Sequence, residues 1–178
     1  RGGIGYVEEF ATARLLRDAH LGSIWEGTGN IVAIDALKRA IGRHGAESAL
    51  GADLHARLDE SANVPQAWRD RLHGLTDRAI AFARDVAANA DNEAEARRAT
   101  STLYHIASAV SLAWEGGRIY EMRGDAKRLL LSRMVVDHRL TVQDPFKSTA
   151  SGAERDMAAD VLGDHAVSME RAAALLAA

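Results

Sequence analysis

The stretch PQAWRDRLHGLTDRAIAFARDV, residues 65–86, decides the fold of this protein. Its apolar side chains recur at intervals of three and four positions, which is the spacing of one face of an α-helix. Pro65 suits the first turn of such a helix, because proline has no backbone N–H to leave unpaired there. The stretch therefore predicts a long amphipathic helix that buries one face. That face carries Trp68, Leu72, Leu75, Ala79, Phe82 and Val86.

The rest of the chain has the same helical periodicity, interrupted by glycine-rich or polar turns. No stretch alternates apolar and polar residues in the manner of a half-buried strand. Alanine, the best helix former, is abundant, and prolines occur only at positions 65 and 145. Long helices with short connections predict an all-α protein folded as an antiparallel helical bundle. The further helices are expected over about residues 8–20, 28–42, 47–60, 93–122, 129–136 and 154–178.

The composition excludes several classes of protein. Of the 178 residues, 47% are apolar and 26% are charged, as in ordinary soluble proteins. No apolar run approaches the roughly 20 residues that span a bilayer, so no membrane span is expected, and no secretory signal is visible. The absence of cysteine excludes disulfides and thiol catalysis and fits a reducing compartment, so we expect a cytoplasmic location. A net charge of −3 gives no reason to expect a nucleic-acid partner.

The first residues suggest that the chain is a piece of a longer protein. It opens without methionine, in the middle of a glycine-rich stretch at Arg1-Gly2-Gly3. A natural domain boundary falls more often in a polar linker. The clearest linker inside the chain is Ser-Ala-Asn-Val-Pro at residues 61–65. We therefore expect two regions, residues 1–62 and 63–178.

Three short motifs near the start are unusual for plain bundle sequence. They are Gly-Gly-Ile-Gly-Tyr at residues 2–6, Arg-Leu-Leu-Arg-Asp-Ala at residues 14–19 and Ile-Trp-Glu-Gly-Thr-Gly-Asn at residues 24–30. In this order and spacing they resemble the C-terminal signature of the acyl-CoA dehydrogenases. That family shows a Gly-Gly-x-Gly-aromatic segment, an Arg-Leu-x-Arg-Asp-Ala helix, and an aromatic-Glu-Gly-Thr turn that opens the next helix. The resemblance covers residues 2 to about 39.

The resemblance implies a reaction and a catalytic residue. In the family a glutamate removes the α-proton of an acyl-CoA thioester, and hydride passes from the β-carbon to N5 of FAD. Many members carry that glutamate directly before Gly-Thr, which is the position of Glu26 here. Because the α-proton is only weakly acidic, the base must lie within hydrogen-bond reach of it. The neighbouring Gly27 is expected to let the substrate approach the backbone closely.

The cofactor contacts are implied by the resemblance in the same way. Gly2 and Gly3 match a glycine pair that meets the nucleotide end of FAD, commonly an FAD bound mainly by a neighbouring subunit. Thr28 matches a threonine that contacts FAD at a helix N-terminus, where anions are favoured. Asn30 stands where many members have glutamine, and Gly29 where many have serine. The family further implies an electron-transfer flavoprotein as electron acceptor and a homo-oligomeric assembly.

The chain runs beyond the usual end of the family, which should fall near residues 44–50. Residues 1–62 are therefore expected to be the end of the family's C-terminal helical domain, and residues 63–178 an additional helical region. An extension of this kind resembles those of two branches of the family, the very-long-chain type and the AidB-like alkylation-response flavoproteins. The sequence of residues 25–31 is closer to that of the second branch. The additional region could then contact DNA, or act as a helical oligomerisation module. We expect the chain by itself to bind FAD poorly and to be inactive.

The remaining polar residues give no further site. None of the seven histidines has a His-x-x-x-His or comparable spacing, so no metal is expected. A group of basic residues in the second half is the only candidate nucleic-acid surface. Acidic residues interleave with them, which favours an ion-paired helix surface over nucleic-acid binding. The basic residues are Arg118, Arg123, Lys127, Arg128, Arg133 and Arg139.

Overall fold

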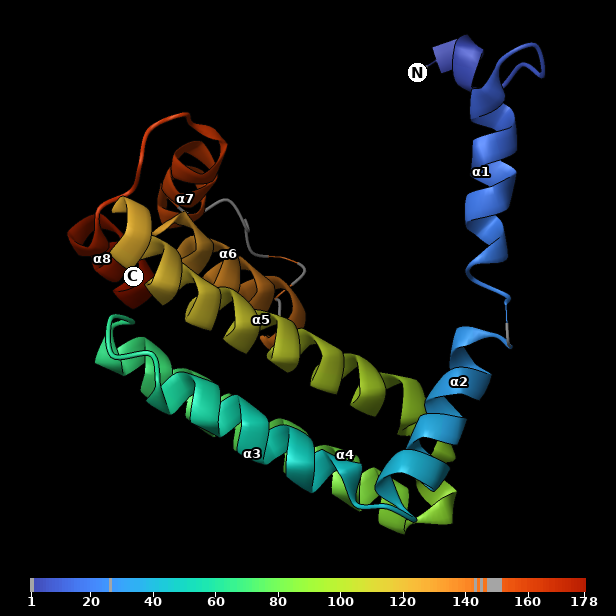
Figure 1. The fold of residues 1–178 in the computed structure, drawn as a ribbon. Coiled ribbons are helices and arrows are strands. Elements are labelled where there is room, and N and C mark those ends of the chain that lie inside the picture. The colour runs from blue at the N-terminus through green and yellow to red at the C-terminus, as the bar shows by residue number, and fades with distance from the viewer. Residues whose placement is uncertain (1, 26, 143, 145, 147–151) are drawn as a thin grey trace.

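The computed structural model describes residues 2–25, 27–142, 144, 146 and 152–178. Within these residues the chain forms eight α-helices and no strand, which confirms the predicted all-α bundle (Figure 1). None of the helices in the described part is long and apolar enough to cross a membrane. The helices are α1 (Ala11–Leu21), α2 (Gly29–Asp35), α3 (Ala46–Asp59), α4 (Gln66–Ala88), α5 (Ala96–Arg123), α6 (Lys127–Val135), α7 (Gly152–Leu162) and α8 (Met169–Ala177).

Four short helical segments extend or join these helices. A 3-10 turn, η1 (Gly2–Gly5), precedes α1, and another, η3 (Ala90–Glu95), joins α4 to α5. Two π-helical segments, η2 (Ala36–Ile41) and η4 (Val136–Leu140), continue α2 and α6 without a break. The predicted helix over residues 28–42 is therefore one rod made of α2 and η2.

The centre of the molecule is the antiparallel packing of the three long helices α3, α4 and α5, with α6, α7 and α8 at one end (Figure 1). The helix predicted from residues 65–86 is α4, and Trp68 and Leu72 on its predicted stripe are buried in the main core. Leu54 and Leu58 of α3 join them, so the face that periodicity predicted is the face that packs. Other buried members include Ile106, Val110, Leu129, Leu130 and Val136.

A second apolar cluster fastens the α2–η2 rod to the other end of the bundle. Ala33, Leu37 and Ile41 of the rod pack against buried residues of α4 and α5. Both clusters thus combine residues from before and after the linker at residues 61–65. The division into residues 1–62 and 63–178 remains a prediction, and physically the two regions share their cores. The partners from α4 and α5 are Ala83, Val86, Ala96 and Ala99.

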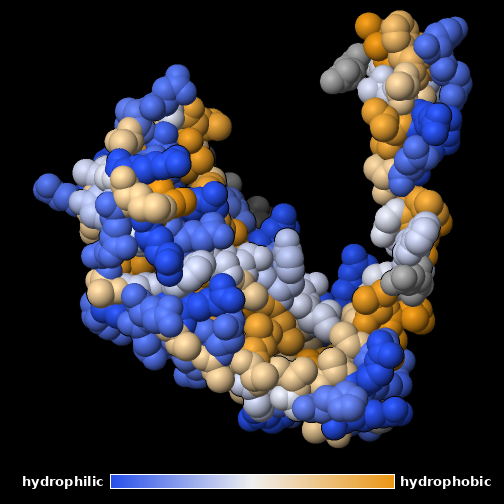
Figure 2. All heavy atoms as spheres, viewed as in Figure 1, coloured by the Kyte–Doolittle hydropathy of each residue, from blue (hydrophilic) through white to orange (hydrophobic). Residues whose placement is uncertain are grey.

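Residues 2–25, here called the N-terminal arm, project away from the bundle (Figure 1). Two contacts tie the residues before α1 to that helix. Arg17 donates to both carboxylate oxygens of Glu8, at 2.6 and 3.1 Å, and the Thr12 hydroxyl donates to the Ile4 carbonyl at 3.2 Å. Apolar residues lie exposed along the arm (Figure 2). They are Ile4, Tyr6, Val7, Phe10, Leu15, Leu16, Leu21, Ile24 and Trp25.

The predicted helix over residues 154–178 is wrong as a single helix, because it is broken between α7 and α8. Ser168 caps α8 by accepting the backbone N–H of Arg171 at 3.2 Å. The backbone of Val167 makes two hydrogen bonds to the residues just before α6. Its N–H donates to Asp125 Oδ1 at 3.1 Å, and its carbonyl accepts from the backbone N–H of Ala126 at 2.9 Å. A continuous helix would lose these bonds, which is why the chain turns here.

The last turn of α7 contains a carboxylate, Asp160, with a perturbed pKa. Arg171 Nε donates to Asp160 Oδ2 at 3.0 Å, and His165 Nε2 lies 3.2 Å from Asp160 Oδ1. The hydrogen bond from Arg171 is the main reason why the pKa of Asp160 lies below its usual value, although burial acts in the opposite direction. A carboxylate whose pKa is lowered by folding stabilises the folded state above its unfolded pKa. That stabilisation is lost as the pH falls through the folded pKa.

Replacing Asp160 with asparagine should therefore destabilise the protein at neutral pH and make it less sensitive to acid. The gap in unfolding free energy between wild type and D160N should be widest near pH 7 and should close as the pH falls through the lowered pKa of Asp160 in the folded state. Urea unfolding at a series of pH values measures it. The matched control is D164N, since Asp164 is exposed and makes no ion pair within the described residues. A D160N gap that stayed constant with pH would contradict the prediction.

Candidate functional site

The segment from Gly27 to Asn30 lies at the joint between the N-terminal arm and the bundle (Figure 1). Gly27 has φ +107°, and a Cβ atom there would lie 3.2 Å from Cγ2 of Ile31. Both facts favour glycine, because L-residues rarely adopt this φ and because a Cβ atom would crowd the Ile31 side chain. Thr28 is the N-cap residue of α2 and has an extended backbone, but its side chain makes no capping hydrogen bond. Glu26 lies outside the described residues, so its role as a base remains a prediction.

The two groups of predicted FAD contacts lie at opposite ends of α1. Gly2 and Gly3 are in η1, at the far end of the arm, whereas Thr28 and Asn30 are at its attachment to the bundle. A helix of 11 residues separates them, which corresponds to about 16 Å. The structure therefore does not bring these residues together within one chain. The separation is compatible with contacts divided between neighbouring subunits, as the resemblance implies.

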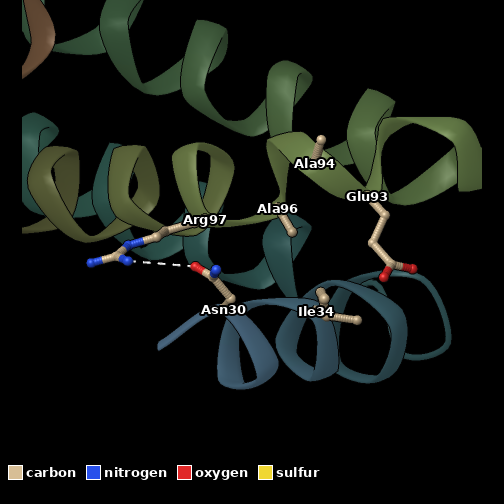
Figure 3. Close-up of a pocket in the computed structure, with 6 residues that line it drawn as sticks. All are labelled: Asn30, Ile34, Glu93, Ala94, Ala96 and Arg97. Carbon is tan, nitrogen blue, oxygen red and sulfur yellow. Dashed lines mark hydrogen bonds between the residues drawn. The ribbon is translucent and has the colours of Figure 1, made fainter. Parts of the chain in front are cut away.

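A cavity of about 270 Å³ opens beside Asn30, on the bundle side of the joint (Figure 3). Arg97, from the first turn of α5, donates through Nη1 to Asn30 Oδ1 at 3.4 Å. Glu93 also lines the cavity, and its carboxylate pairs with Lys38 at 2.7 Å. Ile34, Ala94 and Ala96 complete the lining. Sequence reasoning missed Arg97 and Glu93, because no local pattern relates them to a residue more than 60 positions earlier.

Two histidines that the sequence leaves unconnected lie side by side on α3 and α4. His55 Nδ1 and His73 Nδ1 are 2.6 Å apart. Each ring places its other nitrogen near a carboxylate of the opposite helix, with His55 Nε2 2.9 Å from Asp77 and His73 Nε2 3.3 Å from Asp59. The gap between the Nδ1 atoms admits a proton but no metal ion, since each zinc–nitrogen bond alone is about 2.0 Å long. Within the described residues, no group of three or more potential ligands could hold a metal.

The basic residues of the second half mostly have partners within the bundle. Arg128 pairs with Glu115 at 2.5 Å, and Arg133 pairs with Asp137 at 2.9 Å. The Arg118 guanidinium lies 4.8 Å from the ring centre of Trp114. These contacts agree with the ion-paired surface that the interleaved charges predicted.

Comparison with known proteins gives two matches. The chain is 23% identical over 146 residues to acyl-CoA dehydrogenase family member 11 of Caenorhabditis elegans, covering 82% of this chain and 24% of that protein. It is 54% identical over 37 residues to the putative acyl-CoA dehydrogenase AidB of Escherichia coli (strain K12), covering 21% of this chain and 7% of that protein. No family model matches the chain. No solved structure matches it significantly.

These matches support a general class of protein. The chain is similar to members of the acyl-CoA dehydrogenase family, which are oxidoreductases, and this supports the family that the three motifs indicated but no particular branch. Because 146 of 178 residues are matched, the similarity to the first relative extends well beyond the linker at residues 61–65. The chain spans only about a quarter of that relative and less of the second.

Proposed function

We propose that this chain is the C-terminal part of an FAD-dependent acyl-CoA dehydrogenase that forms an α,β-double bond in an acyl-CoA thioester. The observation that carries the proposal is the three linked motifs between residues 2 and 30, in family order and spacing. Similarity to two acyl-CoA dehydrogenase relatives supports it. The resemblance also leads us to propose an electron-transfer flavoprotein as electron acceptor, a homo-oligomer and a cytoplasmic location.

In this proposal Glu26 is the base that takes the α-proton of the thioester. Glu26 would take the proton from the α-carbon, and FAD, when bound, would supply the acceptor for the hydride of the β-carbon. Gly27 leaves the backbone beside the base free of a side chain, which suits close approach by a thioester. Thr28 and Asn30 follow on the same turn and are proposed to contact FAD, and Gly2 and Gly3 to contact FAD of a neighbouring subunit.

The residues beside the turn suit a cofactor that carries phosphate. The amide of Asn30 and the guanidinium of Arg97 supply hydrogen-bond donors at the edge of the cavity in Figure 3. Arginine and amide donors are common partners of phosphate oxygens. The exposed apolar side chains of the N-terminal arm support the proposal that the chain is part of a larger protein or assembly. A surface of this kind is normally covered by another part of the protein or by a partner.

The test is to mix the full-length protein anaerobically with a series of acyl-CoA thioesters and to follow the flavin absorbance. The proposal expects the purified protein to carry FAD and at least one thioester to bleach it. Free coenzyme A, which has no acyl α-proton, is the control and should leave the flavin oxidised. A full-length protein that carried no flavin, or whose flavin no thioester reduced, would contradict the proposal.

A second candidate is a part of an AidB-like flavoprotein whose additional helices contact DNA. The match of 54% identity to the AidB protein over 37 residues favours it, and the internal pairing of Arg128 and Arg133 weighs against it. Titration of the full-length protein with duplex DNA tests it. Binding that weakens steeply with salt would support this candidate, because phosphate contacts release counterions. No binding at low salt would exclude it.

A further inference from the structure

The additional helical region supplies a side chain to the turn that carries the proposed base. We propose that Arg97 and Asn30 together bind a phosphate group beside the turn, and that Arg97 in addition orients the Asn30 amide. This inference rests on the proposed function, because the phosphate would belong to FAD or to the coenzyme A part of the substrate. It assigns a role to α5, which lies beyond the part of the chain that contains the three motifs.

The first step is the placement of the guanidinium. Arg97 reaches from α5 to the first two residues of α2: its Nη1 donates to Asn30 Oδ1 at 3.4 Å, and its Cζ lies 3.9 Å from where a Cβ on Gly29 would be. Figure 3 shows the guanidinium of Arg97, from α5, beside the amide of Asn30, at the start of α2. The contact spans 67 positions of sequence, so only the packing of α5 against α2 creates it.

The second step concerns the direction of the Asn30 amide. A guanidinium has donors and no acceptor, whereas a carboxamide has an oxygen that accepts and an NH₂ that donates. Arg97 can therefore pair only with Oδ1 of Asn30, and this assigns the orientation of the amide without ambiguity. The NH₂ group is then turned away from Arg97. It has no acceptor within the described residues and remains available to donate to a ligand.

The third step concerns charge. In the part of the chain that the structure describes, Arg97 has no acidic partner, while its neighbour Arg98 pairs with Glu95 at 2.7 Å and lies over the ring of Phe82. The carboxylate of Glu93 on the same cavity is neutralised by Lys38. Of the charged residues that line the cavity, Glu93 thus has a partner of opposite charge, and the positive charge of Arg97 is the one without such a partner in the described residues. Such a charge attracts an anion, and the planar fork of arginine suits a phosphate.

The direct test uses the full-length protein, prepared without FAD, and inorganic pyrophosphate. In a titration followed by ¹⁵N NMR, we expect the side-chain NH₂ of Asn30 and the backbone N–H of Gly29 to shift. Arg97→Gln should weaken this binding about tenfold or more, as for the loss of one charge-assisted hydrogen bond. Arg98→Gln is the matched control and should leave it unchanged, and Arg97→Lys should restore part of it. Absence of shifts at Asn30, or equal effects of R97Q and R98Q, would overturn the inference.

A double-mutant cycle in the full-length protein tests positioning and identifies the source of the phosphate. If Arg97 also orients the Asn30 amide, the loss of binding in the combined variant Asn30→Ala/Arg97→Gln should be smaller than the sum of the losses in the two single variants. Dissociation constants for FAD and for coenzyme A form the two arms, and the arm that changes names the ligand. Additive effects would refute positioning. If thioesters still bleach the flavin while neither arm changes, the inference fails and the proposed function stands.

Discussion

Replacing Glu26 with glutamine in the full-length protein should abolish reduction of the flavin by acyl-CoA while leaving FAD bound. Glutamine has nearly the size of glutamate, but its amide cannot accept the α-proton at neutral pH. A positioned base contributes about 10²- to 10⁴-fold to a proton transfer, so the rate of flavin bleaching should fall by about a thousandfold. Anaerobic stopped-flow absorbance measures that rate, and the flavin spectrum of the variant before mixing measures bound FAD.

Two further variants make this test specific to one carboxylate. Glu26→Asp keeps the base but withdraws it by one methylene, so we expect a rate between those of wild type and E26Q, because misplacement by about 1 Å can cost about a hundredfold. Glu9→Gln removes an exposed carboxylate elsewhere in the same arm and should change the rate little. If E26Q reduced its flavin within about twofold of the wild-type rate, Glu26 would not be the base.

Replacing Trp68 with alanine should cause a large loss of stability. The indole is 2% exposed and lies in the main core. Its Nε1 donates to Ser132 Oγ at 3.2 Å, and that hydroxyl donates to the Ala109 carbonyl at 2.7 Å, so a chain of two hydrogen bonds joins α4, α6 and α5. Truncating a buried tryptophan costs about 3–5 kcal/mol, a large part of a typical total stability of about 5–15 kcal/mol. Urea unfolding followed by circular dichroism measures the loss.

Two matched variants separate the sources of this loss. Trp68→Phe retains most of the apolar contact but removes the hydrogen bond to Ser132, and it should cost clearly less than W68A. Trp25→Ala removes an indole of the N-terminal arm that is 62% exposed, and it should cost no more than about 0.5 kcal/mol. A W68A variant as stable as W25A would mean that the packing around Trp68 contributes little to folding.

Most of the helices were predictable from the sequence because their signals are local. The stripe from Trp68 to Val86 predicted α4. The break expected between the helices over residues 93–122 and 129–136 lies at Gly124, which has φ +67°, and at Asp125, which accepts the Lys127 backbone N–H. The break between α7 and α8 was missed. It depends on bonds between Val167 and the start of α6, about 40 residues earlier, and no periodicity contains such information.

In the candidate site, too, some features follow from local sequence and others from contacts between distant segments. The sequence by itself determined the order of helices, the buried face of α4 and the motif around Gly27, because periodicity and short motifs depend on residues a few positions apart. Only the tertiary structure decided that Arg97 meets Asn30, that His55 meets His73, and that the N-terminal arm leaves its apolar side chains exposed. Those contacts follow from which helix faces pack together. That choice is made by the burial of the two apolar clusters as a whole, and no single segment of the chain contains it.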